Sequence, residues 1–66
     1  MIENVNPPVN VGDVIRGVKC EAIGVKGDGI FKFEKFVIIC PDVDLKGTYD
    51  LRITKVLPRL AFAEKA

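Results

Sequence analysis

Apolar residues recur at every second position in several short segments of this chain. The alternation is clearest in the segment 48–56, where three apolar residues alternate with three polar ones. A period of two places successive side chains on opposite faces of a β-strand, so we expect one face of this segment in the core and the other, which carries Arg52, in water. The segment 14–23 contains the same alternation. No segment repeats apolar residues at helical spacing over the length of a helix, so the pattern predicts an all-β fold.

Two β-prone runs, 30–33 and 36–40, are separated only by Glu34 and Lys35. This is the spacing of a two-residue β-hairpin, in which opposite residues share a face. We predict a buried face made by three cross-strand pairs: Phe33 with Phe36, Phe31 with Ile38, and Gly29 with Cys40. The other face is then partly exposed and carries Ile30, Lys32, Val37 and Ile39. A tight turn of this kind prefers glycine, so a longer loop that exchanges the two faces is the alternative.

Glycine and proline mark the turns between these runs. The turns fall at 24–29, 41–47 and 57–59, and a frayed end at 65–66 follows the last strand. The pattern therefore predicts five short strands, at 14–23, 30–33, 36–40, 48–56 and 60–64. Such a set favours a small five-stranded antiparallel barrel that is closed or nearly closed, because closure removes the exposed edges of the sheet.

The length of 66 residues limits the chain to one small domain. A domain of this size buries only about 60% of the surface of its unfolded chain, so we expect a thin core and no deep catalytic cleft. Residues 1–10 contain Pro7–Pro8 and no apolar period, which predicts a flexible N-terminal arm before a single domain at 11–64. No apolar run approaches the length of a membrane span and no secretory signal opens the chain, so we expect a cytoplasmic protein that does not bind membranes.

The sequence offers little for catalysis or metal binding, since it contains no histidine and no serine. Cys20 and Cys40 lie twenty positions apart, without the Cys-x-x-Cys spacing of a tetrahedral metal site. We predict that both are free buried thiols. A cysteine nucleophile would need a neighbouring base, which the chain does not supply. We therefore expect no enzyme activity, no cofactor, no metal and no small-molecule substrate.

The balance of charges does not decide for or against an anionic partner, because ten basic against nine acidic residues give a net charge of +1. The distribution is more informative, since basic residues recur from Arg16 onward on predicted strands and loops. In the segment 26–33, turn glycines, lysines and phenylalanines occur together. Cations next to aromatic rings are typical of proteins that bind single-stranded nucleic acids, because cations contact phosphates and rings stack on unpaired bases.

Several short motifs of this chain resemble, in order and spacing, those of the TRAM domain. The resemblance covers residues 9–64 and rests on Gly27-Asp28-Gly29-Ile30, Phe36-Val37-Ile38-Ile39-Cys40-Pro41, Gly47, Leu51-Arg52-Ile53-Thr54-Lys55-Val56 and Ala61-Phe62-Ala63-Glu64. It implies a five-stranded β-barrel of the oligonucleotide-binding type that binds RNA. TRAM domains are fused to tRNA-modifying enzymes and, in archaea, occur as stand-alone proteins likened to cold-shock RNA chaperones.

This chain departs from the TRAM pattern at three places. Lys35 stands where the family often has a glycine, and Leu45-Lys46-Gly47 stands where the family has Pro-Gly. The run Ile38-Ile39-Cys40-Pro41-Asp42 replaces Val-Phe-Val-Pro-Gly. Ile39 therefore removes a ring that would stack on a base from the outward face.

We predict a monomeric RNA chaperone that binds single-stranded or tRNA-like structured RNA with low sequence specificity. The cations expected to contact phosphates are Lys26, Lys32, Lys35, Arg52, Lys55 and Arg59. The rings expected to stack on bases are Phe33, Phe36 and Phe62. Two other hypotheses are a protein-interaction or assembly module, which would use an outward patch of Ile30, Val37 and Ile39, and an accessory tRNA-binding domain of an RNA-modifying enzyme.

Overall fold

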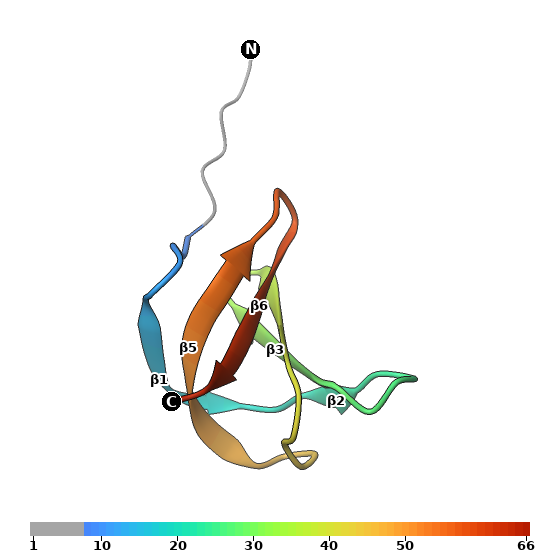
Figure 1. Ribbon diagram of the computed structural model, residues 1–66. Coiled ribbons are helices and arrows are strands. Elements are labelled where there is room, and N and C mark those ends of the chain that lie inside the picture. Colours follow the sequence, from blue (N-terminus) through green and yellow to red (C-terminus); the bar gives the residue numbers. More distant parts are fainter. Residues whose placement is uncertain (1–7) are drawn as a thin grey trace.

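The computed structural model describes residues 8–66, which form one curled β-sheet (Figure 1). Residues 1–7 of the predicted arm lie outside this description. The sequence prediction places Val9 in the arm as well, but its side chain is buried in the core. The Asn10 N–H donates a hydrogen bond of 2.8 Å to Asp13 Oδ2. The folded unit therefore begins before residue 11, and a lone valine next to a proline gave no periodic signal of it.

The sheet has six strands, not the predicted five. They are β1 (Val14–Lys19), β2 (Ala22–Ile23), β3 (Gly29–Phe33), β4 (Phe36–Cys40), β5 (Thr48–Val56) and β6 (Leu60–Lys65). The additional strand arises because Cys20 and Glu21 interrupt the predicted strand 14–23. The Cys20 N–H donates to the Gly47 carbonyl, whereas the Glu21 N–H donates to the Ile30 carbonyl. Within two residues, the chain therefore stops pairing with the segment at Gly47 and begins to pair with β3.

The short connection at Cys20 and Glu21 links the two ends of the sheet. The strands are ordered β1-β5-β6-β4-β3-β2, so β1 and β2 lie at opposite ends of the sheet although they are consecutive in the sequence. The sheet must curl for this short connection to close it, and Figure 1 shows the resulting half-barrel. The C-terminus is part of it, because β6 reaches Lys65 and the Ala66 N–H donates to the Asp50 carbonyl over 2.9 Å. The predicted fraying at 65–66 is therefore wrong.

One strand pair is parallel, which corrects the prediction of a wholly antiparallel barrel. β4 and β6 run in the same direction, with Val37 opposite Leu60 and Ile39 opposite Phe62. β6 follows β5 as an antiparallel hairpin, and its other edge pairs with β4. The alternation of side chains predicts which face of a strand is buried, but it contains no information on the neighbouring strand or its direction.

The β3–β4 hairpin has the predicted register. Phe33 pairs with Phe36, Phe31 with Ile38, and Gly29 with Cys40. The turn is the tight one, because Glu34 and Lys35 have φ angles of 50° and 69°. Positive φ at both central residues is the geometry of the primed turns that fit the twist of a hairpin. The longer loop that would exchange the two faces does not form.

The core lies inside the curled sheet and contains residues that alternation predicted, together with Val9. The largest side chains that are fully buried are Phe31, Ile38, Leu51, Ile53, Val9, Cys20 and Cys40. Both cysteines are unpaired in the described part of the chain, as predicted.

Tyr49 closes one end of the core. Its ring meets Phe31 edge to face, with centroids 6.3 Å apart, and its hydroxyl accepts a hydrogen bond of 2.9 Å from the Asp44 N–H. The ring also covers Gly47, where a Cβ atom would lie 2.6 Å from it. Tyr49 thereby holds the 44–47 loop against the sheet.

Candidate functional site

The outward side of the sheet carries a continuous row of side chains across five strands. In the strand register, neighbours across strands share a face. Ala22 pairs with Ile30, Ile30 with Ile39, Ile39 with Phe62, and Phe62 with Lys55. We call these five residues the outer row. Since β4 and β6 are paired in parallel, the row extends from the β2–β3 hairpin to β5 without a break.

A bulge in β5 sets the position of Phe62 within this row. The register between β5 and β6 shifts between Ile53 and Lys55, so that Thr54 is the extra residue. The Thr54 hydroxyl donates a hydrogen bond of 3.2 Å to the Phe62 carbonyl. Bulges commonly redirect side chains at functional positions. Here the bulge places Lys55, and not Thr54, opposite the phenylalanine.

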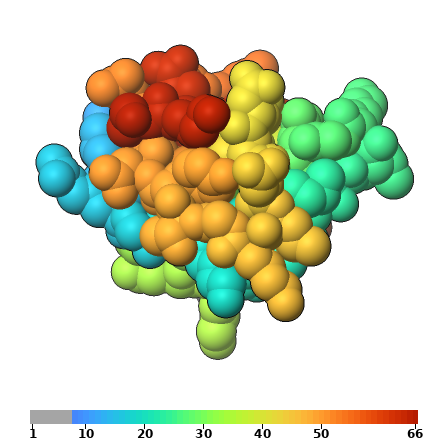
Figure 2. Space-filling model, turned by 90° about the horizontal axis from the view of Figure 1, so that it is seen from below, coloured from blue at the N-terminus to red at the C-terminus, as the bar shows by residue number. Residues whose placement is uncertain are grey.

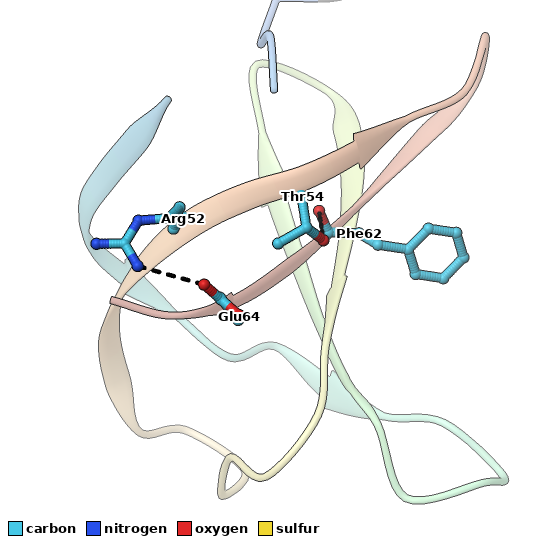
Figure 3. Close-up of polar contacts among 4 residues, drawn as sticks. All are labelled: Arg52, Thr54, Phe62 and Glu64. Carbon is cyan, nitrogen blue, oxygen red and sulfur yellow. Dashed lines mark hydrogen bonds and ion pairs between the residues drawn. The ribbon is translucent and has the colours of Figure 1, made fainter. Parts of the chain in front are cut away.

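Of the three rings that the sequence suggests for stacking, Phe62 is the one on the outer row. It is 36% exposed, and Figure 3 shows its ring directed away from the barrel. Phe36 is buried, so its ring offers no face to a ligand. Phe33 is half-buried and packs against the core. The sequence could not single out Phe62, because Ala61 and Ala63 on either side of it are apolar too.

Five of the six predicted cations are exposed, either on the outward face of the sheet or in loops and turns. Lys55 belongs to the row, and Lys32 lies on the same outward face of β3 as Ile30. Lys26 lies in the 24–28 loop, which projects from the side of the molecule as the green segment in Figure 2. Lys35 and Arg59 lie in the turns before β4 and β6, at the same end of these parallel strands.

Arg52, the sixth predicted cation, is exposed but engaged. Its Nη1 atom lies 3.2 Å from Glu64 Oε2, across the β5–β6 pair (Figure 3). Among residues 8–66 it is the only ion pair. Both side chains are about half exposed, so the pair contributes only about 0 to 1 kcal/mol to stability. The pair matters for the charge of the surface: Glu64 offsets Arg52, whereas Lys55 beside Phe62 has no acidic partner within the described residues. We therefore leave Arg52 out of the candidate site.

The described residues contain no cluster of three or more His, Cys, Asp or Glu side chains that would hold a metal ion. Residues 8–66 also include no helix that is long and apolar enough to cross a membrane.

No protein-family model matches the chain. Two longer proteins contain a similar segment. The chain is 44% identical over 57 residues to ribosomal RNA large subunit methyltransferase E of Haloarcula marismortui, and 35% identical over 49 residues to translation initiation factor 2 subunit beta of Methanosarcina mazei. The alignments cover 86% and 74% of this chain, but only 21% of the methyltransferase and 24% of the initiation factor.

A relative of similar size comes from Methanocaldococcus jannaschii. This uncharacterized protein is 40% identical over 60 residues, which cover 91% of the present chain and 77% of the relative. The chain belongs to the family of this small protein. A conserved protein of Methanococcus maripaludis, whose structure was solved in solution, has the same fold as the present chain, with a TM-score of 0.85 and 33% identity. That match covers 92% of this chain and 86% of the other.

Proposed function

We propose that this chain is a TRAM-like domain with a barrel of the oligonucleotide-binding type. The topology supports this assignment. If β1 and β2 are taken as one bent strand, the sheet order becomes a five-stranded ring that is closed by the connection at Cys20 and Glu21. In barrels of this type, ligands bind the face of the second and third strands and the loops beside it. Those strands correspond to β3 and β4, which carry Ile30 and Ile39 of the outer row.

The function that this geometry supports best is binding of single-stranded RNA across the outer row. One observation carries the proposal: the exposed ring of Phe62 lies between Ile39 and Lys55, a lysine that has no acidic partner within residues 8–66. A base would stack on the ring, and the lysines would follow the phosphates. The row contains no acid–base pair or nucleophile, so we propose binding without catalysis.

The names of the longer relatives support an RNA partner. One is a ribosomal RNA methyltransferase and the other is a translation initiation factor subunit. Because the shared segment occupies about a fifth to a quarter of each protein, it is best explained as a module with a role common to both. We propose that this role is to hold RNA. A chaperone role would follow if the domain holds the single strand more tightly than the duplex.

A second candidate function rests on the apolar part of the same face. Ile30, Val37 and Ile39 are half-buried on the outward face: Ile30 pairs with Ile39, and Val37 lies two residues from Ile39 along β4. They form a patch that a protein partner would cover. Sedimentation velocity separates this candidate from the first. RNA binding predicts a monomer at all concentrations that binds RNA, whereas assembly through the patch predicts a sedimentation coefficient that rises with concentration and does not respond to RNA.

Fluorescence anisotropy of labelled single-stranded RNA, hairpin RNA and duplex DNA, measured over a salt series, tests the proposed function. We expect the single strand to bind most tightly and the affinity to fall as salt rises, because each phosphate contact releases counterions. Lys55→Ala should weaken binding and flatten the salt dependence by about one contact. Lys19→Ala, an exposed lysine on β1 outside the outer row, is the matched control. Absence of binding to all three probes at low salt would refute the function.

A further inference from the structure

An apolar groove lies at the end of the outer row, between the 24–28 loop and the sheet. It has a volume of about 170 Å³ and is lined by Gly24, Val25, Lys26, Asp28, Ile30 and Ile39. Two backbone hydrogen bonds hold the loop that forms its rim: the Gly24 N–H donates to the Asp28 carbonyl over 2.8 Å, and the Gly27 N–H donates to the Gly24 carbonyl over 2.9 Å. The loop stands clear of the rounded body in Figure 2.

The chemistry of this groove suits a flat apolar ring. Val25 is an apolar residue on the rim with a fully exposed side chain, at 105% of its reference surface. Ile30 and Ile39 form the floor and belong to the outer row, and Ile39 is the register partner of Phe62. The groove therefore continues into the surface beside the exposed ring. Neighbouring strands are about 4.8 Å apart, so roughly 10 Å separates Ile30 from Phe62 across the row.

We propose that this groove holds one unstacked nucleobase of a bound RNA strand, close to the base that stacks on Phe62. The inference rests on the proposed function. An apolar cavity of about 150 Å³ accommodates a benzene ring, so a groove of this volume accommodates the ring of a single base. Lys26 on the rim carries the charge that complements the phosphate next to that base. A base paired within a duplex cannot enter, so the groove selects single-stranded RNA.

The substitution Gly24→Leu would block the groove without disturbing the fold. A Cβ atom at Gly24 would lie 3.7 Å from Ile30 Cδ1 and 3.6 Å from the Asp28 carbonyl oxygen, which are ordinary contact distances. Gly24 also has no positive φ angle, so its backbone conformation suits a larger residue. Val37→Ala is a control on the same outward face, since Val37 is half-buried like Ile39 but does not line the groove. Thermal unfolding of both variants would verify that they remain folded.

The test uses a labelled pentauridylate RNA and five versions that each lack one base. We expect two positions at which loss of the base weakens binding by about tenfold, because each stacked or enclosed base contributes strongly. Gly24→Leu should bind the intact RNA about tenfold more weakly and become insensitive to base loss at one of these positions. Phe62→Ala should become insensitive at the other. Val37→Ala should keep both sensitivities.

The outcomes distinguish the inference from the proposed function. If the intact pentanucleotide binds but Gly24→Leu retains both sensitive positions, or if no second position is sensitive, the groove holds no base and the proposed function is unaffected. If neither the pentanucleotide nor a longer single strand binds at low salt, the proposed function itself is wrong. Methyl resonances of Ile30 and Ile39 give an independent readout, since a base in the groove should shift them upfield and the matching abasic RNA should not.

Discussion

Replacing Phe62 by alanine should weaken RNA binding while most of the domain stays folded. The ring is 36% exposed, so about two thirds of its surface is covered. Truncation to alanine then removes roughly 80 Å² of buried apolar surface, or about 2 kcal/mol at ~25 cal/mol per Å². The residue lies at the surface, so no closed cavity adds to this cost. The Thr54 hydroxyl bonds to the Phe62 carbonyl, so this contact survives the substitution.

The expected loss of binding is larger than unfolding can explain. Stacking on one ring contributes about 1 to 3 kcal/mol, which corresponds to about a 5- to 150-fold change in Kd. A small domain with a stability of about 3 kcal/mol that loses about 2 kcal/mol is still about 85% folded. The unfolded fraction therefore lowers the apparent affinity by less than about a fifth. Anisotropy titrations of Phe62→Ala and wild type with the same single-stranded RNA should show the difference directly.

The absence of tryptophan from the chain allows a sharper version of this experiment. Phe62→Trp keeps an aromatic ring at the position and introduces a single tryptophan as a fluorescent probe. Stacking of a base on the indole should quench its emission with the same Kd that anisotropy gives, and affinity should equal or exceed that of wild type. An affinity of Phe62→Ala within twofold of wild type, or unchanged emission from Phe62→Trp at saturating RNA, would refute stacking at this site.

Three further predictions concern the fold. Lys35→Gly should raise the free energy of unfolding by about 1 kcal/mol in urea titrations. The reason is that Glu34 and Lys35 both have positive φ, and glycine adopts this left-handed conformation without strain. A lower stability of the variant would contradict this prediction. Gly29→Ala should cost about 1 to 3 kcal/mol, because the new methyl group collides with the Val43 side chain, and adding Val43→Ala should recover part of the loss; an unchanged thermal midpoint would show that the strand adjusts freely. Burial raises the pKa of the Cys40 thiol above its ordinary value of 9.0, so the folded state favours the neutral thiol. The stability that the neutral thiol contributes is complete below about pH 9 and is lost as the pH rises through the raised folded pKa. Wild type should therefore lose more stability than Cys40→Ala between about pH 8 and pH 10. Parallel pH profiles for the two proteins would contradict this prediction.

The sequence predicted those parts of the fold that depend on local alternation. The buried and outward faces of β3, β4 and β5 agree with the structure, including the register of the hairpin from Gly29–Cys40 to Phe33–Phe36. The tight turn was recognisable from its spacing although it lacks glycine. The backbone strain of this turn is confined to two residues in the left-handed conformation, and all five cross-strand pairs of the hairpin still form.

The parts that the sequence did not predict depend on long-range pairing. Whether β6 lies beside β4, and in which direction, follows from how the sheet curls and not from any residue in β6. The outer row could therefore not be assembled in advance. The pairing of Arg52 with Glu64 was missed for the same reason, since it depends on the β5–β6 register. The break at Cys20 requires hydrogen bonds to Gly47 and Ile30, both distant in the sequence.

The parallel pairing also shows which side chain lies beside Ile39, one of the positions at which the chain departs from the family that it resembles. The resemblance places a phenylalanine of the family at this position, and its replacement by isoleucine removes a ring from the outward face of β4. Phe62 is the register partner of Ile39 on the adjacent strand, about 4.8 Å away along the same row. Phe62 lies between the apolar groove and Lys55, so the row keeps one exposed aromatic surface without a ring at position 39. On this reasoning Ile39→Phe would place a second ring beside the first, and the double variant Ile39→Phe/Phe62→Ala should recover RNA affinity that Phe62→Ala alone loses.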